Sequence, residues 1–209
     1  MHVETPDHDS PRLHAKRAFD FTIAVAMLTV LAPVLAVIAV LIKREDGGPA
    51  IYTQQRVGKD GALFTIYKFR SMYMDADARR AALLAEADSG KGLFKMRDDP
   101  RVTPIGRVIR KYSLDELPQL FNVLRGDMSL VGPRPALPEE VGIYDDTERR
   151  RLVVTPGLSG LWQVSGRSDL AWEDGIRLDL YYVENWSMAA DLVILWRTAK
   201  TVLFPRGAY

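Results

Sequence analysis

The chain has 209 residues, with 28 lysines and arginines against 27 aspartates and glutamates, a formal net charge of +1. This length suits one domain plus an anchor. The near-neutral balance argues against nucleic acid as the main partner, because such binders usually carry a clear positive excess. Without cysteine there are no disulfides, thiolate metal sites or cysteine nucleophile, and all three histidines lie within the first 14 residues. Chemistry in the rest of the chain must therefore use carboxylates, lysine, arginine, hydroxyls or backbone groups.

The N-terminal quarter contains the most informative segment. Residues 1–15 are polar and are predicted to form a mobile tail. From Phe21 to Ile42 the chain is uncharged, and about 20 apolar residues suffice for a helix to cross a bilayer. Pro33, preceded by Ala32, interrupts this run, and proline kinks or breaks a helix.

The charges around this segment bear on its topology. Basic pairs stand on both sides, at residues 16–17 and 43–44, whereas a spanning helix tends to have its cations on the cytoplasmic flank only. We therefore favour a re-entrant helix-break-helix over residues 16–45, with both ends on the cytoplasmic side. A spanning helix, a buried helix of a soluble protein and, less favoured, a signal peptide are the alternatives.

Residues 46–209 are predicted to form an α-rich α+β cytosolic domain. Two β-type runs, 51–53 and 63–67, flank an Asp-Gly turn at Asp60-Gly61 and predict a hairpin. Helices are expected at 75–87, 103–124 (two, divided near Ser113), 139–152, 170–185 and 191–204. A glycine- and proline-rich loop is expected at 126–138, and a loop or short strand at 156–167. The last helix mixes apolar residues and Trp196 with Arg197 and Lys200, which fits both an interfacial helix and a helix that closes the core.

The sharpest local signal runs from Ser113 to Leu120. Its spacing of Ser113 and Glu116 predicts a capping box at a helix start. A helix N-terminus also attracts phosphate, and Arg110 just upstream adds positive charge. The adjacent acids Asp115 and Glu116 in such a place could hold a divalent cation or attack phosphorus.

A series of motifs in a fixed order makes the chain resemble the bacterial sugar transferases, the monotopic phosphoglycosyl transferases. The motifs are Lys16-Arg17-Ala18-Phe19-Asp20, Tyr67-Lys68-Phe69-Arg70-Ser71-Met72, residues 99–106, 113–123 and 126–129, Gly132-Pro133-Arg134-Pro135, and Pro156-Gly157-Leu158-Ser159-Gly160 with Gln163 and Gly166-Arg167. Each motif is weak alone, but the ordered series covers nearly all of residues 16–204 and is specific.

The resemblance implies an enzyme at the cytoplasmic face of the bacterial inner membrane. Such enzymes transfer a hexose-1-phosphate from a UDP-hexose to undecaprenyl phosphate, release UMP and require Mg²⁺. Asp115 would be the nucleophile that forms an acyl-phosphate, and Glu116 would position the metal or a proton, so that both acids are the expected metal ligands. By resemblance to exopolysaccharide-initiating members, galactose or glucose is the expected hexose. The oligomeric state stays open, with a homodimer among the options.

Other residues are expected at the substrate. Arg110 and Arg134 are predicted to bind phosphate or nucleotide, Lys68 and Arg70 lipid phosphate, and Gln163 and Arg167 the uridine. By contrast, the basic run 149–151 is predicted to be a solvated or membrane-facing surface. Two rival functions remain: a glycosyltransferase that releases UDP, and a non-catalytic membrane scaffold of a polysaccharide assembly complex.

Overall fold

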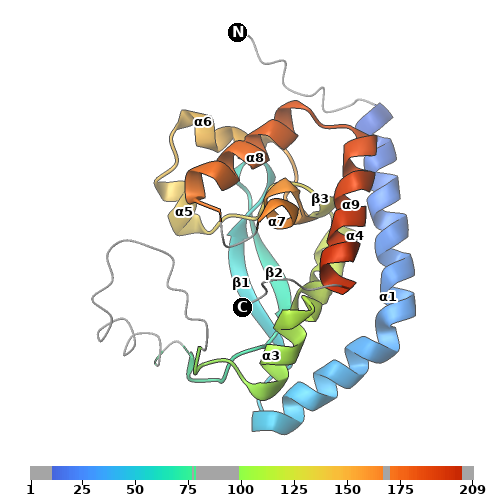
Figure 1. Ribbon diagram of the computed structural model, residues 1–209, viewed down its shortest axis with the longest axis vertical. Helices are drawn as coiled ribbons and strands as arrows, with labels where there is room; N and C mark the ends of the chain where they lie inside the picture. Colours follow the sequence, from blue (N-terminus) through green and yellow to red (C-terminus); the bar gives the residue numbers. More distant parts are fainter. Residues whose placement is uncertain (1–10, 77, 79–98, 167–169, 204–209) are drawn as a thin grey trace.

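The computed structural model describes residues 11–76, 78, 99–166 and 170–203. The described part is helix-rich, with two small sheets and one long N-terminal helix (Figure 1). Its elements are α1 (Pro11–Asp46), β1 (Ile51–Val57), η1 (Lys59–Gly61), β2 (Leu63–Phe69), α3 (Pro104–Lys111), η2 (Leu114–Gln119), α4 (Leu120–Arg125), β3 (Ser129–Val131), α5 (Pro138–Gly142), α6 (Asp146–Arg149), η3 (Arg150–Val153), β4 (Gly157–Ser159), α7 (Leu161–Ser165), α8 (Trp172–Glu184) and α9 (Met188–Leu203).

Helix α1 runs along one side of the domain and bends part-way, so that its second half turns beneath the rest (Figure 1). Pro33 lies inside it and has no N–H to donate to the carbonyl of Thr29. The predicted helix-break-helix is thus one continuous bent helix. Residues 11–15 are helical too, and belong to α1 rather than to the predicted tail.

The apolar surface of α1 is mostly uncovered. Only 11% of its most apolar stretch of 18 residues is buried, and the side chains of Val30 and Val37 are 76% and 58% exposed. A core helix of a soluble protein would bury such residues, so this alternative is not supported. Within the described part, α1 is the one helix long and apolar enough to cross a membrane. The domain side of the helix buries Ala24, Ile38 and Ile42.

The predicted hairpin is confirmed. Strands β1 and β2 are antiparallel, from the Ile51–Phe69 pair to the Val57–Leu63 pair, and Asp60 adopts a positive φ of 55° in the turn. The outer edge of β2 is closed by the buried side chain of Asn122 in α4, whose amide donates to the Thr65 carbonyl at 2.7 Å and accepts from the Tyr67 N–H at 3.1 Å. Helix α4 is thereby fastened to the strand that carries Lys68.

The main core lies between α1, α4, the hairpin and the C-terminal helices. Its buried members include Ala24, Ile66, Leu120, Val123 and Ile194. A short parallel sheet of β3 and β4, which the sequence does not predict, packs beside it. A Cβ on Gly157 would lie 2.0 Å from the backbone nitrogen of Gly132, so close backbone packing accounts for glycine there.

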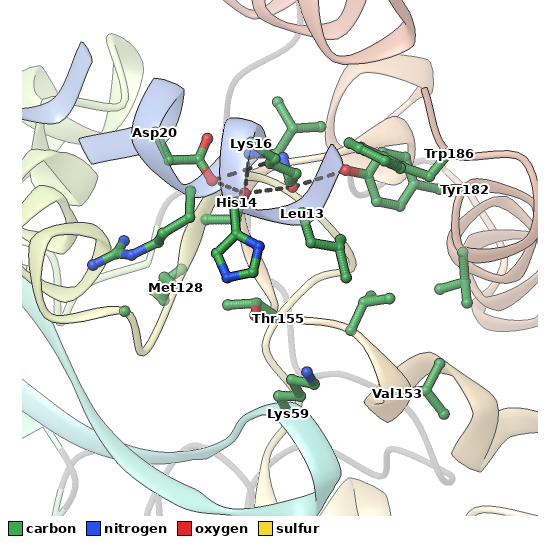
Figure 2. A pocket seen from close by; sticks show the side chains of 16 residues that line it. Leu13, His14, Lys16, Asp20, Lys59, Met128, Val153, Thr155, Tyr182 and Trp186 are labelled. Carbon is green, nitrogen blue, oxygen red and sulfur yellow. Dashed lines mark hydrogen bonds and ion pairs between the residues drawn. The ribbon is translucent and has the colours of Figure 1, made fainter. Parts of the chain in front are cut away.

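A buried polar network, the anchor cluster, joins the start of α1 to α8 and α9. Its members are Lys16, Asp20, Ser129, Tyr182, Trp186 and Asp191. Figure 2 shows four of its members, Lys16, Asp20, Tyr182 and Trp186. Lys16 Nζ lies 2.6 Å from Asp191 Oδ2, which Trp186 Nε1 approaches at 3.1 Å, and Tyr182 lies 2.8 Å from Asp191 Oδ1. Ser129 donates to Asp20 at 2.7 Å. The cluster borders a cavity of about 290 Å³ with largely apolar walls.

Helix α9 combines the two predicted roles, a helix that closes the core and an interfacial helix. Ile194 and Asp191 are buried against the domain, whereas Leu192, Val193 and Trp196 are more than half exposed beside the exposed Arg197 and Lys200. The helix closes the core with one face and presents an apolar, cationic surface with the other.

Candidate active site

The acid pair lies on η2, a short 3-10 helix between α3 and α4. The predicted division near Ser113 is confirmed, because Ser113 adopts a left-handed conformation with φ of 53°. The predicted capping box is wrong, since the Ser113 side chain makes no cap hydrogen bond. A left-handed residue cannot supply the extended geometry of an ordinary N-cap. The turn instead reverses the chain and brings Asp115 and Glu116 against the hairpin.

Asp115 is a partly buried carboxylate with a perturbed proton affinity. Burial, and then the neighbouring charge of Glu116, raise the pKa of Asp115 to about 6, against the opposing charges of Lys68 and Arg110. Within the described residues, its carboxylate makes no ion pair. The group is therefore mostly ionised at pH 7 and uncommitted, as a nucleophile must be.

Glu116 is held by the hairpin. Lys68 Nζ on β2 lies 2.7 Å from Glu116 Oε1, and both side chains are partly exposed, at 26% and 37%. Since Asn122 fixes α4 to the same strand, the spacing between the acid pair and Lys68 is set by the fold. Arg110, in the last turn of α3, contributes the second positive charge felt by Asp115. The structure thus brings four predicted residues together: Asp115, Glu116, Lys68 and Arg110.

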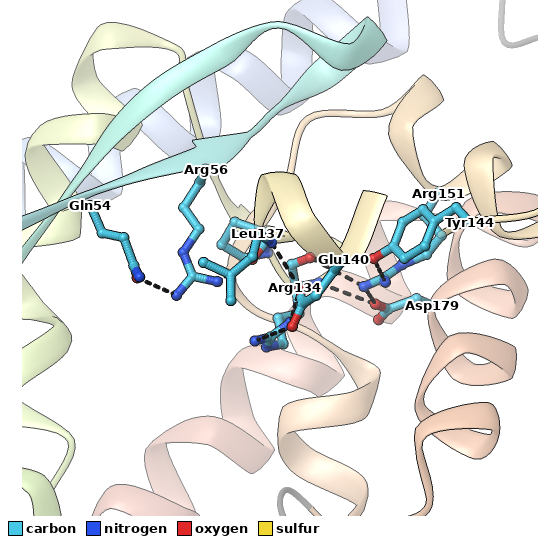
Figure 3. Close-up of polar contacts among 9 residues, drawn as sticks. Gln54, Arg56, Arg134, Leu137, Glu140, Tyr144, Arg151 and Asp179 are labelled. Atoms are coloured by element: carbon cyan, nitrogen blue, oxygen red, sulfur yellow. Dashed lines mark hydrogen bonds and ion pairs between the residues drawn. The ribbon is translucent and has the colours of Figure 1, made fainter. Parts of the chain in front are cut away.

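Arg134 belongs to a second group beside the far end of β1 (Figure 3). Its guanidinium meets the carboxylate of Glu140, with the shortest contact at 2.9 Å, and lies 5.6 Å from the ring centroid of Trp162. The loop backbone is fixed as well: the Arg134 N–H donates to Asp179 at 3.2 Å, and its carbonyl accepts from Arg151 at 3.2 Å.

Arg151 corrects a prediction. It was expected on a solvated or membrane-facing surface, yet it is only 2% exposed, ion-paired with Asp179 and bonded to the Tyr144 hydroxyl at 2.6 Å. Asp179, 28 residues further on, supplies the buried partner, and nothing in the local run of arginines reveals it.

Arg56 on β1 is a site residue that the sequence analysis missed. It donates to the Pro135 carbonyl at 3.1 Å and to Gln54 at 2.7 Å (Figure 3). Its pKa is lowered by burial and then by Arg134, whereas Glu140 and Glu116 act in the opposite direction. Arg56 thus connects the acid pair to the Arg134 group. In the sequence, only the position of Arg56 in a predicted hairpin strand could have drawn attention to it.

The remaining predicted substrate residues differ in their placement. Arg70 donates through Nε to the Pro49 carbonyl at 2.8 Å and through both Nη atoms to Asp46, and it is 7% exposed. This arrangement ties the end of α1 to β2 and does not support the predicted phosphate contact. Gln163 lies on α7 next to Trp162, with its Oε1 buried and without a partner in the described structure. Arg167 lies outside the described residues.

The acid pair fits one way of holding Mg²⁺. Among the described residues no cluster of three or more histidines, cysteines or acids is present. Mg²⁺ commonly binds through one or two carboxylates together with substrate phosphates and waters. Asp115 and Glu116 match that donor set, so a metal here would arrive with, or be completed by, a phosphate substrate.

An apolar groove of about 320 Å³ lies between the bend of α1, the base of the hairpin and the end of η2. Its lining is Leu28, Ala32, Leu35, Ala39, Ile51, Phe69, Pro118 and Phe121. Phe69 follows Lys68 in the chain and Pro118 stands two residues after Glu116, so the same segments carry the groove wall and the charged site.

Comparison with known proteins identifies the family of the chain. Residues 11–205 match the family described as Bacterial sugar transferase. The chain is 48% identical to an undecaprenyl-phosphate galactose phosphotransferase of Salmonella typhimurium over 93% of its own length and 41% of that protein. It is 43% identical to the exopolysaccharide production protein ExoY of Sinorhizobium fredii, over 93% and 88%.

A third relative, an undecaprenyl-phosphate glucose phosphotransferase of Komagataeibacter xylinus, is 42% identical over 93% of this chain and 37% of its own length. The chain therefore spans less than half of the Salmonella and Komagataeibacter proteins, but most of ExoY.

Proposed function

This chain belongs to the bacterial sugar transferase family, and from that premise we propose that it transfers a hexose-1-phosphate from a UDP-hexose to undecaprenyl phosphate, releasing UMP. The observation that carries the proposal is the partly buried Asp115 carboxylate, which feels the positive charges of Lys68 and Arg110 and has no ion pair among the described residues. Galactose or glucose is the proposed hexose, since relatives are named for each.

In the first step, an Asp115 carboxylate oxygen attacks the sugar-bearing phosphorus of the donor. The bond from that phosphorus to the bridging oxygen breaks, and UMP leaves with the electron pair. The product is an acyl-phosphate between Asp115 and the hexose-1-phosphate. Lys68 and Arg110 face the charge that spreads over the phosphoryl oxygens in this displacement.

In the second step, an oxygen of undecaprenyl phosphate attacks the same phosphorus and frees Asp115 as a carboxylate. The lipid-linked diphosphosugar results, and a covalent intermediate thus divides one hard transfer into two. The apolar groove is where the isoprenoid chain would lie, with its phosphate at the acid pair. Glu116, held by Lys68, orients the metal or accepts a proton.

Mg²⁺ would be held by Asp115 and Glu116 with the donor diphosphate, and it would neutralise charge on the transferred phosphoryl group. The bent α1 would enter one leaflet and return, at the cytoplasmic face of the inner membrane, so that the acceptor phosphate meets Asp115 at headgroup depth. Phe21, Val25, Val30 and Val37, all more than 40% exposed, form the surface that lipid would cover.

One experiment separates this proposal from its rivals. The full chain in detergent or nanodiscs is given Mg²⁺ and a panel of UDP-hexoses, with and without undecaprenyl phosphate, and the released nucleotide is identified. UMP from one donor supports the proposal, whereas UDP indicates a direct glycosyltransferase. No nucleotide from any donor, with folded protein, favours the scaffold.

A further inference from the structure

Two arginines of the same hairpin are used in opposite ways. Arg70 has its counter-ion within the fold: its Nε donates to the Pro49 carbonyl, and both Nη atoms donate to the Asp46 carboxylate. Arg56 donates only to neutral oxygens, of Pro135 and Gln54, and within the described residues it has no ion pair. Its Nε is buried and has no partner. A partly buried cation without an anion is less stable than one whose charge a ligand balances.

The surroundings of Arg56 indicate what that ligand is. Arg134 lies close enough for its charge to lower the pKa of Arg56, after the larger effect of burial. The Glu140 carboxylate acts on Arg56 by its charge, but its oxygens are engaged with Arg134 and with the N–H of Leu137 (Figure 3). On the other side, the charge of Glu116 reaches Arg56 from the acid pair. Two neighbouring guanidiniums with one committed carboxylate leave net positive charge beside the reacting carboxylates.

We propose that Arg56 and Arg134 together bind the diphosphate of a nucleoside diphosphate substrate, on the side of the leaving nucleotide. This rests on the proposed function and adds a residue to its site. Planar guanidinium groups suit phosphate oxygens because they donate in parallel pairs. Arg56 uses one hydrogen on each Nη for the neutral oxygens, which leaves the second hydrogen on each Nη for phosphate.

The alternative is that Arg56 only braces the loop through the Pro135 carbonyl. A brace needs one donor and no charge, so it predicts an effect on folding and none on nucleotide affinity in protein that is folded. The two readings therefore separate in a binding measurement that does not depend on turnover.

The test measures UDP binding to the full chain in nanodiscs by calorimetry, without lipid acceptor. R56Q should weaken UDP binding about ten- to a hundredfold, the range for losing hydrogen bonds to a charged group. R56K, which can still brace Pro135 but lacks the planar fork, should also bind UDP several-fold more weakly. R177Q removes an arginine that is 79% exposed on α8 and is the matched control.

Turnover supplies a second reading. R56K should raise the KM for UDP-hexose and leave the KM for undecaprenyl phosphate unchanged. Melting curves identify any variant that is not folded. UDP affinity of folded R56K equal to that of R177Q would overturn the inference. If the wild type binds UDP yet releases no UMP from any donor, the proposed function fails, while the UDP affinities still decide the role of Arg56.

Discussion

The anchor cluster and the acid pair are both groups of opposite charges, but the fold treats them differently. Asp191 is fully buried, and each of its oxygens has partners among Lys16, Tyr182 and Trp186. Asp115 is partly buried, and its pKa rises to about 6 because burial and Glu116 outweigh the nearby cations. The protein supplies the counter-ion and hydrogen-bond donors of Asp191, whereas Asp115 has no ion pair among the described residues and stays available to a substrate.

Two aspartates thus differ in role because of their partners: Asp191 stabilises the fold, and Asp115 is available for chemistry. A buried carboxylate whose two oxygens are both bonded, as in Asp191, holds elements together, and removing its cation leaves an unpaired charge. A partly buried charged group without an ion pair lowers the stability of the fold, and proteins retain such groups where catalysis needs them. Arg70 and Arg56 on the hairpin repeat the same contrast.

The largest expected effect is on turnover. D115N should reduce UMP release at least about a thousandfold, since the other carboxylate, Glu116, is held in an ion pair by Lys68. The same variant should be more stable at pH 7, by at most about 3 kcal/mol, because a raised pKa means that the ionised carboxylate disfavours the folded state there. D60N, in the hairpin turn, is the isosteric control. Retained turnover by D115N would remove the nucleophile assignment.

The next effect is on stability. K16M leaves Asp191 buried beside no cation and should destabilise the domain by about 3–5 kcal/mol. R177M breaks an exposed pair with Asp174 and should change stability by less than about 1 kcal/mol. Chemical denaturation in micelles measures both. Equal small losses would mean that the anchor cluster does not hold α1 to α9.

A third, intermediate effect depends on pH. The rate of UMP release in a single turnover without acceptor should fall as the pH decreases through about 6, because protonated Asp115 cannot attack. Above that value, the dependence should flatten. Omitting the lipid removes its phosphate as a competing titration. An acid limb centred near 4 would show that the substrate-bound site restores an ordinary carboxylate.

The smallest effect concerns the groove. A32F fills part of its lining and should raise the KM for undecaprenyl phosphate several-fold, with the KM for UDP-hexose unchanged. A36F adds the same ring to an exposed position of α1 outside the groove. The same rise in both variants would indicate a general disturbance of α1 in the membrane.

The sequence predicted what depends on local pattern. The uncharged run around Pro33, the hairpin and the division at Ser113 follow from composition, alternation and turn residues, and all are found as a bent helix, a hairpin and a left-handed break. The local pattern indicated the acid pair and the resemblance gave its expected roles, and the fold places Lys68 and Arg110 beside it.

What the sequence did not predict depends on partners far away in the chain. The sequence predicts Arg151 on the surface, but the fold brings Asp179 against it in a buried ion pair. It predicts Arg70 as a phosphate ligand, but the fold pairs that guanidinium with Asp46. The parallel pairing of β3 with β4 joins segments too short to carry a strand pattern. No local pattern marks Arg56, because its role depends on contact with the distant loop that carries Arg134.

Asn122 has a consequence for association. Its amide occupies the backbone groups of Thr65 and Tyr67 that a further strand would use. A second copy of the chain therefore cannot extend the hairpin along this edge. A homodimer would have to form on another surface, away from the strand edge that borders Lys68.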